Sequence, residues 1–189
     1  MWVKRFIISG IGFILLCTII NADENRIAIS GSLFCPSEKA FREIYGTDMM
    51  FGLDIGRNIW KAVELHLEIN YYSKRGQLTL TKERTRIKLI PLALSSRYTF
   101  LKRKINLYAG LGLTYNSFEE KNPIGKVKEY KLGFAIKVGA FKRIKGFKKF
   151  IKVFIMDAYL NYSYCKMKPA EIKFDAGGIN VGIAFGTEF

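Results

Sequence analysis

From residue 23 onward, hydrophobic and polar residues alternate along most of the chain with a period of two. The clearest example is the stretch 63–71, where every odd-numbered position is apolar and the even positions are Glu64, His66, Glu68 and Asn70. Successive side chains of a β-strand point to opposite faces, so this period predicts strands with one apolar and one polar face. After residue 22, only the short stretch 36–46 hints at a helical period. The pattern therefore predicts an all-β protein.

Eight candidate strands follow from this pattern. They cover residues 26–34, 48–57, 63–74, 85–100, 105–118, 130–143, 152–165 and 176–189. Each is long enough for the roughly 9–11 residues that a tilted strand needs to cross a bilayer. The connectors are alternately long and short, apart from 144–151, and 119–129 is one of the long ones. We therefore predict an eight-stranded antiparallel up-and-down transmembrane β-barrel with both termini at its short-turn end.

Aromatic residues are concentrated near the two ends of these predicted strands. Those near long connectors are Tyr71, Tyr72, Tyr115, Phe118, Tyr162 and Tyr164. Those near short connectors are Trp60, Tyr98, Phe100, Phe141, Phe154 and Phe189. Amphipathic rings favour both interfaces of a membrane, so we expect two aromatic bands. Ordinary strand propensity also enriches aromatics, but it does not explain their placement at both ends.

The segment ahead of the strands has the composition of an export signal. Lys4 and Arg5 precede an apolar run from Phe6 to Ile20, and Ala22 stands before a polar stretch. A basic start, an apolar run and a small residue at the boundary are the parts of a secretory signal peptide. The run is shorter than the roughly 20 residues of a spanning helix. We expect residues 1–22 to be a signal peptide and residues 23–189 to form one barrel domain.

The segment 179–189 alternates and ends in Phe189, with Phe185 four positions earlier. Over its whole length after residue 22, the chain resembles the small outer-membrane β-barrels of the OmpA and OmpX type, in architecture rather than through one diagnostic motif. The resemblance implies an integral, monomeric, porin-like protein in the outer membrane of a Gram-negative bacterium. It also implies that Phe185 and Phe189 belong to the signal read by the barrel-assembly machinery, although Thr187 departs from the usual pattern.

If the apolar faces contact lipid, the polar faces point into the barrel. These faces carry Asp54, Glu64, His66, Glu68, Arg97, Lys137 and Asp157. An eight-stranded barrel is barely wide enough for its own side chains, and unpaired buried charges are costly. We therefore expect a largely plugged lumen, in which Arg97 and Lys137 neutralise the carboxylates.

The candidate chemistry of this stripe is limited. Glu64, His66 and Glu68 lie at alternate positions of one strand face and could ligate a metal ion. The chain has a single histidine and no cysteine nearby, so we favour a polar stripe that pairs with neighbouring strands. The same lone histidine has no hydroxyl in its stripe, which argues against an acyl-transfer or hydrolytic triad. We expect no catalytic residues, no metal and no cofactor.

The chain contains 31 Lys and Arg against 16 Asp and Glu, a formal net charge of +15. In a soluble domain this charge would first indicate binding of nucleic acid. The nucleotide-binding P-loop motif is also absent at Gly125, because Glu120 stands where that motif needs its first glycine. In the predicted barrel most cations lie in loops and turns outside the lipid. Those of the long connectors could contact lipopolysaccharide phosphates or simply face water: Lys74, Arg75, Arg84, Arg86, Lys126 and Lys128.

We predict a non-enzymatic integral outer-membrane barrel with a structural or surface-interaction role. Its expected partners are outer-membrane lipids, lipopolysaccharide and the assembly machinery, and not nucleic acid. The main alternative is a narrow channel or a conduit for hydrophobic ligands. A soluble lipocalin-like barrel and a lipid-modifying enzyme fit less well. A soluble barrel would carry charge along its outer faces, whereas the polar face of 105–115 consists of Asn, Tyr, Gly, Gly and Thr.

Overall fold

The structure is a computed structural model that describes residues 25–77, 83–102, 104–123, 125–148, 151–168 and 174–189. The expected signal peptide lies outside the described residues. The long strands are β1 (Asn25–Pro36), β2 (Asp48–Trp60), β3 (Val63–Gln77), β4 (Arg84–Lys102), β5 (Asn106–Asn122), β6 (Gly125–Lys148), β7 (Ile151–Tyr164) and β10 (Gly178–Glu188). The remaining elements are the helix α2 (Lys39–Tyr45) and the short strands β8 (Lys166–Met167) and β9 (Phe174–Asp175).

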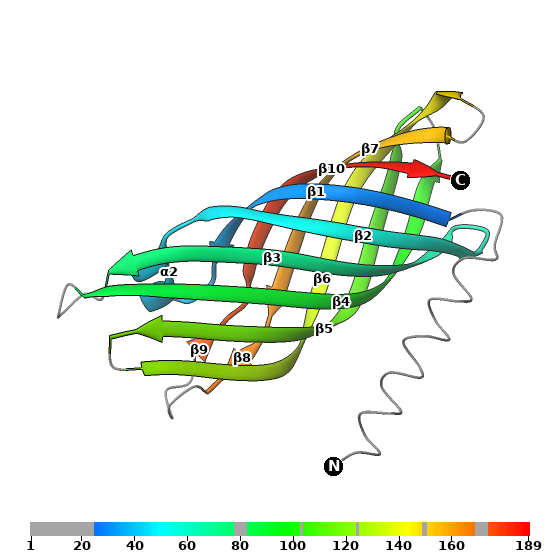
Figure 1. Cartoon of the computed structure of the whole chain (residues 1–189). Coiled ribbons are helices and arrows are strands. Elements are labelled where there is room, and N and C mark those ends of the chain that lie inside the picture. The colour runs from blue at the N-terminus through cyan, green and yellow to red at the C-terminus, as the bar shows by residue number, and fades with distance from the viewer. Residues whose placement is uncertain (1–24, 78–82, 103, 124, 149–150, 169–173) are drawn as a thin grey trace, which may run out of the picture.

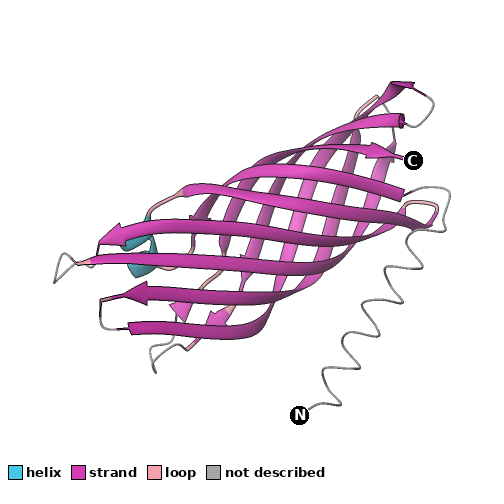
Figure 2. Cartoon of the chain, in the orientation of Figure 1, coloured by secondary structure: helices cyan, strands magenta, loops and turns pink. Residues whose placement is uncertain are grey.

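The eight long strands form one closed antiparallel barrel, which confirms the predicted architecture (Figures 1 and 2). Each strand pairs with the long strands next to it in the sequence, and β1 closes the barrel against β10. Where the barrel closes, the main chains of Asn25 and Phe189 exchange two hydrogen bonds, with N–O distances of 3.3 and 3.0 Å. The carboxyl terminus and the start of β1 therefore lie together at the short-turn end, the right-hand end of Figure 1.

The strands extend farther toward the long-loop end than the pattern predicts. β5 and β6 remain paired up to Asn122 and Gly125, so the long connector expected at 119–129 is wrong. This ribbon escapes a pattern search because it is polar on both faces, and opposite charges such as Glu119 and Lys128 face each other across it. The side-chain oxygen of Asn122 closes the turn by accepting a hydrogen bond from the Gly125 N–H at 3.0 Å.

The stretch 36–46, which showed a helical period in the sequence, contains α2, and this helix lies across the long-loop end of the barrel (Figure 2). Gly46 ends the helix at φ 68°, a backbone angle that favours glycine, and its N–H donates to the Arg42 carbonyl at 2.8 Å. Phe41 and Tyr45 form the buried face of the helix. No helix in the described part of the chain is long and apolar enough to cross a membrane.

The outer wall of the barrel carries a belt of exposed aliphatic and aromatic side chains. Leu111, Leu113 and Leu132 are 63%, 70% and 74% exposed. Exposure on this scale suits contact with lipid and would be a liability in water. Tyr71 and Tyr98 mark the two ends of the belt and are also exposed.

Three aromatics expected at the membrane interfaces lie elsewhere. Tyr72, Phe118 and Phe141 are 0%, 2% and 1% exposed and point into the barrel. The expectation was wrong for them because neighbouring strand residues face opposite ways, so Tyr71 lies outside and Tyr72 inside.

Candidate functional site: a filled lumen and a basic outer wall

The structure places all seven predicted interior residues in the lumen. Asp54 comes from β2, Arg97 from β4, Lys137 from β6 and Asp157 from β7. The other three, Glu64, His66 and Glu68, follow one another at alternate positions of β3. Strand alternation directs each of these side chains inward, and six of the seven are buried.

Five of these residues form one continuous charged network across the short-turn half of the lumen. Arg97 lies between two carboxylates, at 3.4 Å from Asp157 and 3.7 Å from Asp54. His66 extends the network, with Nδ1 2.8 Å from Asp54 and Nε2 3.0 Å from Glu64. Mutual pairing is what keeps charges tolerable in an interior of this kind. The network joins side chains from opposite walls and fills the barrel there.

Lys137 and Glu68 form a second ion pair, with Nζ 2.6 Å from Oε1. The Lys137 ammonium also lies 4.5 Å from the centre of the Tyr159 ring, which favours a cation. Arg97 and Lys137 thus both contact interior carboxylates. Arg97 contacts Asp54 and Asp157, whereas Lys137 contacts Glu68.

Sequence reasoning missed two members of the network, Arg26 and Tyr108. An Arg26 guanidinium nitrogen lies 3.0 Å from Asp157, and the Tyr108 hydroxyl lies 3.1 Å from both oxygens of that carboxylate. Strand parity could have identified both, because Arg26 alternates with Ala28 in β1 and Tyr108 occupies the polar face of β5. Asp157 is therefore the acceptor on which three other strands converge.

Above the charged network, toward the long-loop end, the lumen is apolar. A buried cluster of Phe34, Met50, Tyr72, Leu89 and Phe118 lines the walls there. The apolar face of α2 belongs to the same cluster and covers it from the long-loop side. The lumen is thus blocked twice, first by paired charges and then by a packed apolar layer.

Tyr45 anchors the helix that covers the lumen. Its hydroxyl lies 2.8 Å from a carboxylate oxygen of Glu120 and 3.0 Å from the Thr85 hydroxyl. Burial raises the pKa of Tyr45 above its ordinary value, so the phenol remains protonated and can donate to the carboxylate. Between this apolar layer and the charged network lies a cavity of only about 40 Å³, bordered by Glu68, Lys137 and other polar residues.

The candidate metal ligands of β3 are engaged in contacts within the lumen. Both ring nitrogens of His66 contact carboxylates, so neither faces open space. Among the residues that the structure describes, no group of three His, Cys, Asp or Glu side chains is arranged to hold a metal ion. Cys35 and Cys165 are both free thiols.

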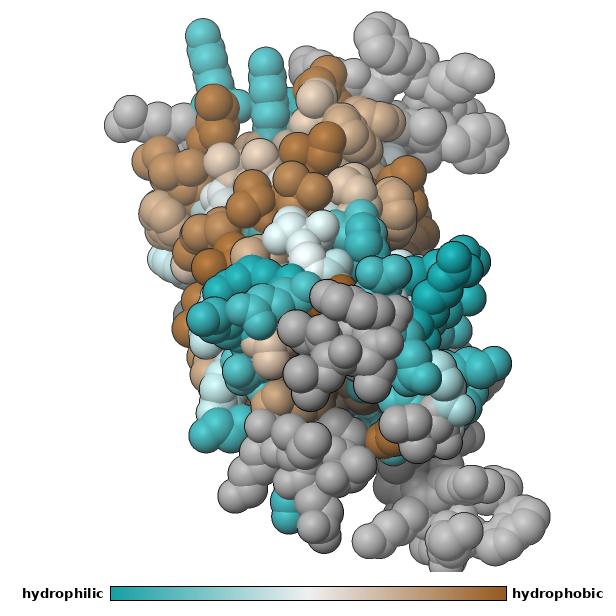
Figure 3. Space-filling view, turned by 90° about the vertical axis from the view of Figure 1, so that its left-hand side faces the viewer, coloured by the Kyte–Doolittle hydropathy of each residue, from teal (hydrophilic) through white to brown (hydrophobic). Residues whose placement is uncertain are grey.

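The cations expected to contact lipid phosphate lie at the long-loop end, and five of the six are exposed. Arg75, Arg84, Arg86, Lys126 and Lys128 occupy outward positions of β3, β4 and β6. The sixth, Lys74, occupies an inward position of β3, and its ammonium lies 2.6 Å from the Asp48 carboxylate. Hydrophilic residues gather around this end of the molecule, and a hydrophobic area borders them (Figure 3).

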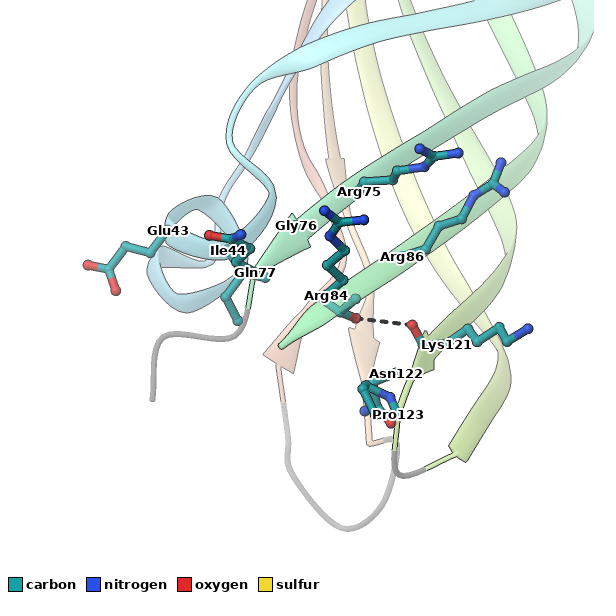
Figure 4. A pocket seen from close by; sticks show the side chains of 11 residues that line it. Glu43, Ile44, Arg75, Gly76, Gln77, Arg84, Arg86, Lys121, Asn122 and Pro123 are labelled. Atoms are coloured by element: carbon teal, nitrogen blue, oxygen red, sulfur yellow. Dashed lines mark hydrogen bonds between the residues drawn. The ribbon is translucent and has the colours of Figure 1, made fainter. Parts of the chain in front are cut away.

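An open hollow of about 1090 Å³ lies beside these cations (Figure 4). Its lining includes Arg75, Arg84 and Arg86, together with Lys121 of β5. Lys121, like Lys126 and Lys128, falls in the presumed connector 119–129, which is strand. Ile44 of α2 forms part of the opposite border. Basic side chains thus line an accessible surface at the tips of three adjacent strands.

A closed eight-stranded antiparallel barrel, with a filled lumen and an apolar outer belt, defines the class of small outer-membrane β-barrels. This chain has that fold. Neither a family model nor a curated protein sequence matches it. Neisserial surface protein A is similar in structure, with a TM-score of 0.66 and 14% identity over 89% of this chain and 98% of its own.

Two further solved structures share the fold. The N-terminal β-barrel domain of OprF from Pseudomonas aeruginosa has a TM-score of 0.56 and 16% identity, over 88% of this chain and 98% of its own. Ail of Yersinia pestis, solved in complex with the heparin analogue sucrose octasulfate, has a TM-score of 0.54 and 13% identity, over 87% of this chain and 97% of its own. At these identities the likeness shows the fold.

Proposed function

We propose that the protein is a non-enzymatic barrel of the Gram-negative outer membrane, with a structural or surface-interaction role and a lumen that does not conduct. The observation that carries this proposal is the double block of the lumen. Ions that enter from the short-turn end meet the Arg97–Asp157 network, and above it they meet the apolar layer under α2. Moving an ion through such a layer without water is costly.

Single-channel recording in planar bilayers tests the closed lumen. We expect no conductance steps from the protein, in membranes where an open porin gives clear steps. The heat-modifiable mobility of the recovered protein verifies that it is folded. A variant with Phe41→Ser and Tyr45→Ser loosens the apolar layer and removes the anchor of α2. It should also remain silent, because the charged network still blocks the lumen. Stable steps from the unaltered protein would overturn the proposal.

The alternative function, a narrow channel or hydrophobic-ligand conduit, has a specific observation in its favour. A recess of about 340 Å³ opens at the short-turn end and is bordered by Glu64, Arg143 and Glu188. It leads toward the charged network, so a conduit would require the ion pairs of the network and then the apolar layer to separate. Reproducible conductance, or passage of an apolar dye into vesicles that hold the protein, would favour this alternative.

We also propose that the terminal strand mediates assembly. Phe185 and Phe189 are 39% and 48% exposed on the outer face, where an assembly factor can contact them during insertion. Replacing Phe189 by alanine should lower the amount of barrel inserted in cells while leaving refolding in detergent unchanged. Equal insertion of the variant and the parent in cells would contradict this role.

A further inference from the structure

Four cations form one row across β3, β4, β5 and β6 near the long-loop end. In the register of the barrel, Arg75 is paired with Arg86, Arg86 with Lys121, and Lys121 with Lys126. All four side chains are exposed, whereas the alternate position Thr85 is buried. Figure 4 shows Arg75, Arg86 and Lys121 extended toward the same side of the sheet. We call these four residues the basic row.

Without a ligand, this arrangement is unfavourable. Directly opposed residues on one face of a sheet have Cβ atoms about 5 Å apart, and like charges at that distance destabilise the pair. The basic row contains three such pairs in succession. Because adjacent positively charged side chains repel one another, a bound polyanion would relieve the repulsion.

The wall around the basic row has little negative charge of its own. In the described parts of β3–β6, its outward face beyond the apolar belt carries one carboxylate, Glu119. The cations on the same face are Arg75, Arg84, Arg86, Lys88, Lys121, Lys126 and Lys128. Glu119 lies 2.6 Å from Lys126 and 3.2 Å from Lys128, and the hydrogen bond from Lys126 lowers its carboxyl pKa. In the pairing register Glu119 lies opposite Lys88 and Lys128, so it is not directly opposite any member of the basic row.

The depth of the basic row identifies the environment it faces. Along β4, the outward residues Arg86 and Lys88 are followed by Ile90 and then by the exposed Leu92 of the apolar belt. The Lys88 ammonium lies 5.3 Å from the centre of the Tyr71 ring, one of the aromatics at the edge of the belt. Cations directly beyond interfacial aromatics lie at the level of lipid headgroups. They point sideways into the headgroup layer, away from the barrel axis.

We propose that the basic row binds the phosphate groups of lipid A, the anionic anchor of lipopolysaccharide, in the outer leaflet. Adjacent strands are about 4.8 Å apart, so the row spans roughly 14 Å and can contact more than one phosphate of one lipid. The two arginines can bind phosphate oxygens in a bidentate manner, and the two lysines act as point charges. The inference rests on the proposed outer-membrane location but not on the closed lumen.

The test compares lipid binding with stability. The protein, folded in an uncharged detergent, is titrated with bisphosphorylated lipid A, and the apparent Kd is obtained from the rise in thermal unfolding midpoint. The test variant is Arg86→Gln with Lys121→Gln, in the middle of the row. The control is Lys39→Gln with Lys168→Gln, which removes equal charge from exposed sites at the same end of the barrel but off the wall.

Each cation near an anionic surface contributes about 1 kcal/mol, so the test variant should raise the apparent Kd about thirtyfold, which equals about 2 kcal/mol. The control should change it less than about threefold. Without lipid A, the test variant should unfold at a higher temperature than the parent, because the repulsion within the basic row is reduced. Weaker binding of lipid A together with a higher unfolding temperature in its absence would distinguish a ligand site from a merely structural feature.

Three results would overturn the proposal. The first is an equal loss of affinity in the control, which would indicate attraction by overall charge. The second is undiminished binding of lipid A from which the phosphates have been removed. The third is tighter, row-dependent binding of a soluble sulfated oligosaccharide than of lipid A, which would assign the row to a polyanion outside the membrane. None of these results depends on conductance, so the closed lumen is tested separately.

Discussion

Replacing Asp157 by asparagine should strongly destabilise the barrel. Asp157 accepts hydrogen bonds from Arg26 at 3.0 Å, Arg97 at 3.4 Å and the Tyr108 hydroxyl at 3.1 Å. Asparagine keeps the volume but removes the charge, so two guanidinium groups that are 4% and 2% exposed lose their shared counter-ion. Removing one partner of a buried ion pair costs about 3–5 kcal/mol. We expect the lower half of this range, because Arg97 retains Asp54 at 3.7 Å.

Equilibrium unfolding in urea, with the barrel inserted in lipid vesicles, measures this loss. The matched control is Asp48→Asn, which removes a carboxylate that also accepts from a cation, Lys74, but whose side chain is 35% exposed. An exposed pair of this kind contributes less than about 1 kcal/mol. Adding Arg26→Gln to Asp157→Asn should restore part of the stability, because one uncompensated charge is then removed. If Asp157→Asn costs no more than Asp48→Asn, the network does not stabilise the barrel.

Two further predictions concern the long-loop end. Burial raises the pKa of the Cys165 thiol to about 11. At pH 8 a maleimide should therefore not label Cys165 in the folded barrel but should label it after unfolding. Rapid labelling of Cys165 in the folded protein, located by peptide mass analysis, would contradict this expectation. Tyr45→Phe removes the hydrogen bonds to Glu120 and Thr85 and should lower stability by about 1 kcal/mol. Because burial raises the pKa of Tyr45, the phenol loses its proton at a lower pH in the unfolded chain than in the folded barrel. The contribution of Tyr45 to stability is therefore complete below about pH 10 and is lost as the pH rises further. Unfolding midpoints of parent and variant at pH 8 and pH 11 should therefore converge, and a gap that widens with pH would refute this reasoning.

The period of two predicted the barrel because the two faces of each strand within the membrane meet different surroundings. On β4, for example, Leu92 and Leu94 face outward and are exposed, whereas Ala93 and Arg97 face inward and are buried. Any strand with this contrast is visible in the sequence. The same parity placed His66 and its partner Glu64 in the lumen, although the second partner, Asp54 on β2, required the register as well.

Other errors come from the part of the barrel beyond the apolar belt at the long-loop end, where polarity reverses. Farther along β4, Ile87 and Leu89 are buried inside, whereas Arg86 and Lys88 point outward. A rule that places apolar residues outside therefore fails there, and the position of Phe118 near the end of its strand did not show that its ring faces inward. The reversal follows from the solvent, because a barrel wall that leaves lipid for water must bury its apolar face inward.

The same reversal links the plug to the basic row. Once apolar side chains turn inward above the membrane, they form the cluster that holds α2 and closes the mouth, as Leu89 does. The outward positions are then free for polar residues, and Arg86 and Lys88 occupy them beyond Ile90 and Leu92 of the outer wall. One change of solvent along a single strand thus accounts for the closed lumen and for the cations at headgroup depth. A channel would not need this inward apolar layer, and a soluble barrel would not need the apolar belt below it.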